Sequence, residues 1–186
     1  MGVDIHIKLY KYNKETNLYE KLALYKTRAK ESYRYNEKGE IVETFPVGSY
    51  EEIYIDVGRD REMFDGLCNL DEDNYGIFPS TYVAYNSFEE KAVKELKEEE
   101  ESFGCYDFSE VSLADIGVYL SQYPTVIDYE SLDWDSWDEL KEEEKPRKTN
   151  RIKYFYEEIC KYAHFADWEF EYSPLSRYKI VFYFDC

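Results

Sequence analysis

The sequence predicts an α+β domain in which hairpins at both ends of the chain build an antiparallel or mixed sheet, with about four helices between and beside them. Three observations support this fold class. Apolar and polar residues alternate near both termini, which is typical of half-buried strands. The middle of the chain has helical periodicity. None of the glycine-containing loops matches the phosphate-binding motifs of doubly wound α/β folds.

The first strand is predicted at 3–10, where apolar residues occupy the odd positions and mostly polar residues the even ones. Turn-forming residues at 13–17 and a second strand at 18–25 complete a hairpin. A second hairpin is centred on 36–39, and the alternation at 53–57 predicts a further strand. Near the C-terminus, the alternating runs 168–172 and 178–184 predict a final hairpin joined by 173–176.

Four helices are predicted, at 59–67, 87–101, 112–122 and 150–164, the last preceded by a basic linker at 146–151. Ser87 and Glu90 have the spacing of a capping box, and Ser112 is a candidate N-cap for the third helix. The length of 186 residues suits one domain, 1–186, in which 87–145 forms a helical insertion.

The chain is strongly acidic, with 41 Asp and Glu against 23 Lys and Arg and a formal net charge of −18. Such a charge repels phosphate backbones and anionic lipids, so direct binding of free nucleic acid or of a membrane is not expected. It attracts basic surfaces, which makes a basic nucleic-acid-binding protein the predicted partner. The alternative is that the acidity only keeps a tyrosine-rich surface soluble. The sequence shows no apolar signal core and no CxxC spacing, so the protein is expected in a reducing cytoplasm.

The segment 128–144 combines aromatic and acidic residues more densely than the rest of the chain. Aromatic rings beside carboxylates make good interface anchors, because they offer a large apolar body with a polar tip. They could equally fill a core. The residues predicted to bind the partner are Tyr129, Asp133, Trp134, Asp135, Trp137 and Asp138.

Asp4 and His6 are two residues apart on the first predicted strand, so both side chains project from the same face. If the first and last strands are neighbours, Asp185 and Asp56 could converge with them at one end of the sheet. Carboxylates with one imidazole would suit Mg²⁺ or Mn²⁺ and phosphodiester hydrolysis, although the sequence requires no cofactor. The alternative is that Asp4 and His6 are simply outward-facing polar positions. His164, at the end of a predicted helix, is interpreted as structural.

Three short segments resemble an uncharacterised family of small phage and prophage proteins. The opening Met1-Gly2-Val3-Asp4-Ile5-His6 is similar to that family's MGxDIH start. Residues 58–64 resemble its GRNYDLF-like segment, and residues 178–185 its RIVFWFDN-like strand. The family's segment with His-Ser-His has no counterpart here, so any activity that depends on those histidines is not expected.

The resemblance implies an origin in a mobile element in a bacterial host. Small acidic proteins of that origin often act against host defence, which together with the charge leads to an expected function as a type II anti-CRISPR, an inhibitor of the RNA-guided nuclease Cas9. Two mechanisms remain open, a steric plug and cleavage of the bound guide RNA with Asp4 and His6 as catalytic residues. The alternatives are a stand-alone metal-dependent phosphodiesterase or nucleotide hydrolase and a phage protein with a structural role.

Overall fold

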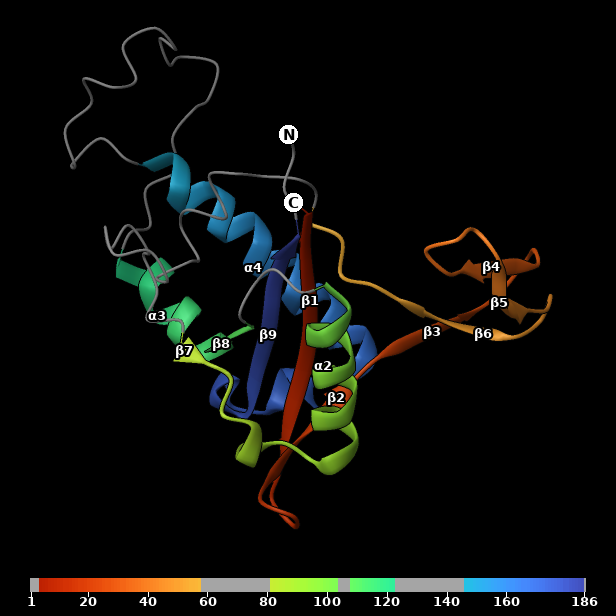
Figure 1. Ribbon diagram of the computed structural model, residues 1–186. Coiled ribbons are helices and arrows are strands. Elements are labelled where there is room, and N and C mark those ends of the chain that lie inside the picture. The colour runs from red at the N-terminus through yellow and green to blue at the C-terminus, as the bar shows by residue number, and fades with distance from the viewer. Residues whose placement is uncertain (1–3, 58–80, 104–107, 123–145, 186) are drawn as a thin grey trace, which may run out of the picture. The chain divides into compact units, whose positions relative to one another are not determined.

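The computed structural model describes residues 4–57, 81–103, 108–122 and 146–185 (Figure 1). The chain divides into two compact units. Residues 1–22 and 55–186 form one unit, here called the body, and Ala23–Tyr54 form the other, here called the hairpin unit. Within the described residues, no helix has both the length and the apolar character needed to cross a membrane.

The body contains a five-stranded sheet in the order β2-β1-β9-β8-β7, and every neighbouring pair is antiparallel. The strands are β1 (Asp4–Asn13), β2 (Leu18–Leu22), β7 (Thr81–Tyr82), β8 (Ser109–Ser112) and β9 (Tyr178–Asp185). Antiparallel sheets combined with helices confirm the predicted α+β class. The first and last strands of the chain are therefore neighbours in the sheet.

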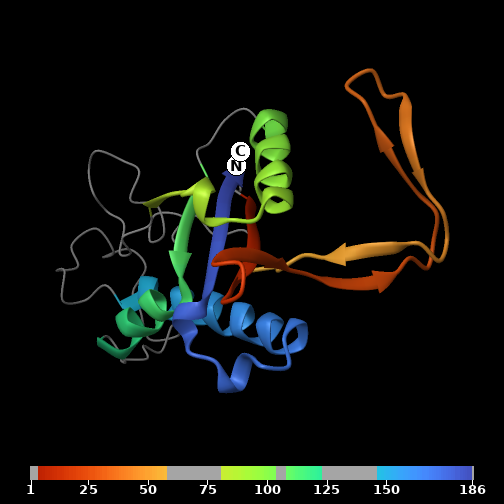
Figure 2. The ribbon, with the colours of Figure 1, turned by 90° about the horizontal axis from the view of Figure 1, so that it is seen from below.

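Helices cover both faces of this sheet, as Figure 2 shows. Helix α2 (Glu90–Phe103) lies on one face, and α3 (Leu113–Gln122) and α4 (Pro146–Ala166) lie on the other. Under α2, Tyr10 of β1 packs in one buried cluster with Phe88, Leu96 and the β9 residues Val181 and Tyr183. The opposite face carries five further buried side chains of β1 and β9, namely Ile7, Leu9, Tyr178, Ile180 and Phe182.

The even, mostly polar positions of the first strand therefore do not all face solvent. Tyr10 is 0% exposed and Lys8 is half-buried, because α2 packs over their side of the sheet. Period-two alternation shows which residues share a face but not whether a helix covers the polar face.

The hairpin unit contains two strand pairs in sequence. β3 (Leu24–Thr27) pairs with β6 (Tyr50–Ile53), and β4 (Ser32–Tyr35) pairs with β5 (Ile41–Phe45). The turn predicted at 36–39 is confirmed: Gly39 has a φ of 78°, and Asn36 Oδ1 accepts the backbone N–H groups of Lys38 and Glu40. No residue of 23–54 is buried.

The sequence prediction is wrong for the run 168–172, which contains a short 3₁₀ helix, η5 (Phe170–Tyr172), instead of a strand. The reason is that β9 already has β1 and β8 on its two edges, so no edge remains for another partner. Residues 173–177 continue into η6 (Leu175–Arg177), and β9 itself is confirmed.

The helix boundaries also differ from the predictions. The basic segment 146–151 is the first part of α4 rather than a linker. Ser87 ends the 3₁₀ helix η1 (Tyr85–Ser87), and its buried Oγ has no hydrogen-bond partner among the described residues, so the predicted capping box is not formed. The Ser112 cap is confirmed, since its Oγ accepts the N–H of Asp115 at 3.1 Å. The predicted helix 59–67 lies outside the described residues, and the segment 87–145 contributes strand β8 to the sheet.

Candidate functional site

The pairing of β1 with β9 brings two of the predicted catalytic positions together. Asp4 and Asp185 are directly opposite each other in the ladder, and His6 is opposite Tyr183. The side chains of Asp4 and Asp185 lie outside the described part of the structure. Asp56 is exposed and lies outside the regular strands. The strand pairing thus places two acidic positions and one histidine within three residues of one another along the end of a ladder.

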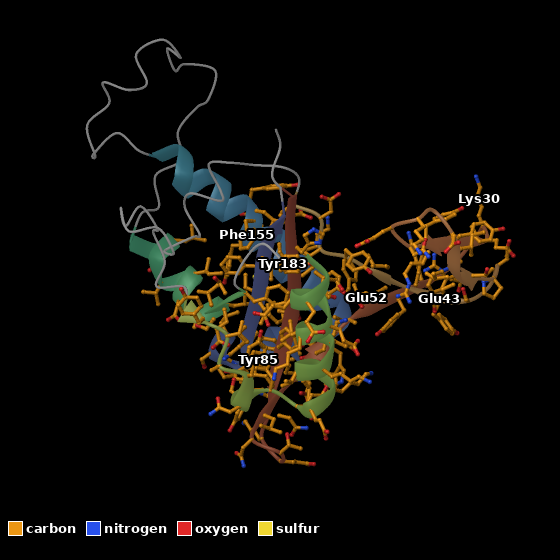
Figure 3. The ribbon with its side chains drawn as sticks, viewed as in Figure 1. Lys30, Glu43, Glu52, Tyr85, Phe155 and Tyr183 are labelled. Carbon is orange, nitrogen blue, oxygen red and sulfur yellow. The ribbon has the colours of Figure 1, made fainter. Side chains whose placement is uncertain are left out.

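His6 takes part in a stack of three rings across the sheet. Its imidazole lies parallel to Tyr183, with ring centroids 4.6 Å apart, and Tyr183 stacks in turn on Phe108 at 4.4 Å (Tyr183 is labelled in Figure 3). Tyr183 and Phe108 are buried and His6 is half-buried. Offset stacking of this kind favours a fixed ring orientation. His6 therefore contributes to packing under α2, whether or not it has a second role.

Among the described side chains, no group of three His, Cys, Asp or Glu residues is placed to hold a metal ion. His164, interpreted as structural, lies in the last turn of α4, where its Nδ1 is 3.3 Å from Glu171 Oε1. That position is consistent with a histidine that joins a helix end to the segment that follows it.

Helix α2 is held to the sheet by ion pairs as well as by apolar packing. Lys8 of β1 binds Glu99, and Lys21 of β2 binds Glu95 at 3.1 Å. Both lysine side chains are at most 13% exposed. Two carboxylates of the acidic run in α2, 30% and 33% exposed, therefore neutralise lysines of the sheet.

Lys179 of β9 is enclosed by rings and one carboxylate. Its Nζ lies 4.0 Å from the centre of the Tyr19 ring and 5.1 Å from that of Phe88, and it binds Glu110 at 2.8 Å. The two charged side chains are 11% and 12% exposed. At this position two rings and one carboxylate together thus stabilise a buried cation.

On the other face, Asp167 lies at the centre of a buried polar network. Its Oδ2 accepts hydrogen bonds from Lys11 Nζ and from the Tyr178 hydroxyl, both at 2.7 Å. Lys11 also binds Glu169 at 2.7 Å. Burial acts to raise the pKa of Asp167, but these hydrogen bonds outweigh it and hold that pKa below the usual value. Burial acts to lower the pKa of Lys11, yet its two carboxylate partners raise it overall.

A shallow polar pocket of about 360 Å³ lies beside this network, at the turn between β1 and β2. Its charged lining consists of three cations and three carboxylates: Lys11, Lys14, Arg177, Glu15, Glu20 and Glu169. Because the two signs are present in equal number, the electrostatics of the pocket select neither an anion nor a cation.

The predicted partner-binding residues, Tyr129, Asp133, Trp134, Asp135, Trp137 and Asp138, all lie outside the described residues. The two longest segments outside the description, 58–80 and 123–145, contain 15 of the 41 acidic residues and only 4 of the 23 basic ones. A large part of the negative charge surplus therefore lies in segments outside the described residues.

Sequence reasoning missed a surface on the hairpin unit. Tyr25, Tyr50 and Tyr54 are 57%, 77% and 73% exposed. In the register of β3 with β6, Tyr25 is opposite Glu52 and Tyr50 is opposite Thr27, so Tyr25 and Tyr50 lie on one side of the ladder, and Tyr54 follows the end of β6. We call Tyr25 and Tyr50 the tyrosine face. The signal was present in the sequence, since 5 of the 21 tyrosines fall within residues 23–54.

No protein-family model, no curated protein and no solved structure matches this chain.

Proposed function

We propose that the protein is an inhibitory binding protein that engages a basic nucleic-acid-binding protein, of which a guide-loaded Cas9-type nuclease is the proposed example. The observation that supports this most directly is the pairing of four lysines with carboxylates inside the chain. Lys8, Lys11, Lys21 and Lys179 are at most 17% exposed, and each binds a carboxylate within the chain.

These internal pairs change what a partner encounters. Four cations are paired within the chain with about as many carboxylates, so in this proposal almost the whole surplus of 18 negative charges remains available to a partner. A protein with this charge is steered toward a cationic groove, where carboxylates can occupy the places of phosphates. In this proposal the rings of Tyr129, Trp134 and Trp137 supply the desolvated centre that charge alone does not provide.

The test uses a purified Cas9-type nuclease loaded with guide RNA. We expect the full chain to bind this complex, to block DNA cleavage and to leave the guide RNA at its original length on a denaturing gel. The double variant Asp4→Ala/His6→Ala, once shown to be folded, should inhibit as well as the natural sequence. A guide that is shortened by the natural sequence but not by this variant would replace the plug mechanism by the catalytic one. Failure of the natural sequence to bind the complex would reject the proposal.

The register that places Asp4 opposite Asp185 favours one second candidate, a metal-dependent phosphodiesterase. Two carboxylates beside an imidazole are a donor set that Mg²⁺ or Mn²⁺ accepts, and the metal would activate a water for attack on a phosphodiester. This candidate predicts Mn²⁺-stimulated hydrolysis of bis(p-nitrophenyl) phosphate with no partner protein present. Asp4→Asn should abolish that turnover, whereas His164→Ala, which changes the other histidine of the chain, should not.

A further inference from the structure

The most exposed aromatic rings described in the body lie close together in the chain, where α4 ends. Phe165, Trp168 and Tyr172 are 68%, 81% and 82% exposed. Trp168 is the only tryptophan among the residues that the structure describes, and tryptophan side chains are ordinarily highly buried. Three such rings within eight positions exceed the scattered apolar residues of an ordinary surface. Residues 165–172, here called the tryptophan turn, therefore have the composition of a protein-binding surface.

The backbone of the tryptophan turn is fixed from inside the body. Asp167 accepts the N–H of Glu169 at 3.1 Å and the hydroxyl of Tyr178 at 2.7 Å. The N–H of Phe170 donates to the carbonyl of Asp167, and that of Tyr172 to the carbonyl of Glu169, both at 3.0 Å. The Phe170 ring packs edge-on against the buried Tyr178 ring, with centroids 4.9 Å apart. The exposed rings thus stand on an ordered backbone, so that little backbone entropy is lost when a partner binds them.

The charge around the tryptophan turn indicates the chemistry of the partner. The charged residues that line the neighbouring pocket carry both signs in equal number and cancel. Asp167 and Glu171 add two carboxylates to this balance, and residues 162–176 contain no Lys or Arg. Glu169, which follows Trp168 in the chain, lines the pocket, so the exposed indole adjoins a concave surface. A cation of a partner would therefore meet an indole beside a surplus of negative charge, which is complementary to it.

We propose that the tryptophan turn is a docking surface for a basic surface of a partner protein, with an arginine or lysine of the partner over the ring of Trp168. Tryptophan is the side chain whose ring attracts a cation most strongly. The inference rests on the proposed function in taking the partner to be basic, and it places one contact on the described part of the body. A second copy of this chain is disfavoured as the occupant, because two molecules of charge −18 repel each other.

The first test compares two double variants of the full chain for binding to the guide-loaded nuclease. Trp168→Ala/Tyr172→Ala removes two rings of the turn, and since neither ring is buried the fold should persist. The control, Tyr82→Thr/Tyr154→Ala, removes two other exposed rings of the body and keeps residues that suit a strand and a helix. We expect the first variant to weaken binding about 30-fold and the control less than about twofold. Equal affinities of the two variants would overturn the inference.

A matched pair of charge reversals tests the complementarity. Glu171→Lys and Glu157→Lys change the net charge of the chain by the same amount, at positions that are 57% and 60% exposed, but only Glu171 belongs to the tryptophan turn. We expect Glu171→Lys to weaken binding about fivefold and Glu157→Lys less than about twofold. Equal losses would overturn the inference, because the charge would then act through the whole molecule and not at this surface.

A further test separates this inference from the proposed function. The full chain is titrated with a peptide of nine arginines, and the indole N–H signals of its three tryptophans are followed by NMR, with Trp168→Phe assigning one of them. A shift of the Trp168 signal that a peptide of nine serines does not produce supports the docking surface, even if the nuclease itself is not bound. An unchanged Trp168 signal overturns it, whether or not Trp134 and Trp137 respond. Binding to phosphatidylcholine vesicles that is lost in Trp168→Ala/Tyr172→Ala would also overturn it, by making a lipid surface the occupant.

Discussion

Asp167 connects three parts of the body through one carboxylate. It follows α4, accepts hydrogen bonds from Lys11 of β1 and Tyr178 of β9, and accepts the backbone N–H of Glu169 at 3.1 Å. Only 6% of its side chain is exposed. Removing Asp167 takes away the acceptor of the Tyr178 hydroxyl and leaves Lys11 with Glu169 as its remaining carboxylate partner, and breaking up such a buried group costs more than the group itself contributes.

We therefore predict that Asp167→Ala lowers the free energy of unfolding by about 3 kcal/mol. The matched control is Glu169→Gln, which changes the second carboxylate on Lys11 at a position that is 43% exposed, and should cost less than about 1 kcal/mol. Urea denaturation of both variants measures the difference. If the two changes proved equally mild, Asp167 would not be the centre of the network.

The same residue predicts how stability depends on pH. The pKa of Asp167 is lower in the folded chain than its ordinary value of 3.8, so its contribution is present above about pH 4 and is lost as the pH falls through the folded pKa. The pKa values of Lys11 and Tyr178 are raised, so their contributions are lost as the pH rises above about 10.

We expect the stability difference between the natural sequence and Asp167→Asn to be constant from about pH 5 to pH 9. This stability difference should become smaller below about pH 4 and above about pH 10, because one partner of the network changes its charge there. Denaturant titrations across this range measure it. A difference that grows as the pH falls below 4 would have the wrong sign for a carboxylate held by hydrogen bonds.

At the scale of elements, α2 covers the face of the sheet opposite α3 and α4, so that the body has three layers. Leu96 is 0% exposed in the cluster with Tyr10 and Val181. We predict that Leu96→Ala costs about 3 kcal/mol, through lost burial and the cavity that remains. Lys94→Ala, on the outer side of the same helix with 77% of its side chain exposed, should cost less than about 0.5 kcal/mol. Thermal unfolding tests both, and similar losses would mean that α2 is not docked through Leu96.

The elements show where sequence reasoning succeeds and where it does not. β1, β9, the turn at Asn36 and the Ser112 cap could all be predicted, because each is fixed by residues close together in the sequence. The run 168–172 could not, because its alternation is local while the availability of a sheet edge depends on the whole fold. The burial of Tyr10 beneath α2 could not be predicted for the same reason.

The candidate sites divide in a similar way. The sequence predicted that Asp4 and Asp185 converge only if the first and last strands are neighbours, because the residues of a strand do not determine which strands lie beside it in the sheet. The stacking of His6 on Tyr183 could not be predicted, because it needs the register of two strands and the two residues are 177 positions apart in the chain. The tyrosine face was missed because its residues come from opposite ends of the hairpin unit and share a side only through the β3–β6 register.

At the scale of the whole molecule, the division into two units makes a prediction about their independence. Leu24 and Ile53 are opposite each other, so replacing 25–52 by Asn-Gly closes the ladder with a two-residue turn. Because no residue of the hairpin unit is buried, we expect the melting temperature to change by less than about 3 °C. Loss of cooperative unfolding, measured by circular dichroism, would show that the body depends on this unit.

The last prediction follows from the net charge of −18 and concerns the rate at which the protein associates with its proposed partner. Steering by exposed charges acts over the screening length, which falls from roughly 10 Å at 0.1 M salt to about 3 Å at 1 M. Between 50 and 500 mM salt we expect the association rate with the guide-loaded nuclease to fall at least about tenfold, while the dissociation rate changes less than about threefold. The variant Asp133→Asn/Asp135→Asn/Asp138→Asn should show a weaker salt dependence, because it removes three of the charges that act at long range. If the association rate changed neither with salt nor with these substitutions, the acidic residues would serve solubility alone. The partner would then have to be recognised by the aromatic rings.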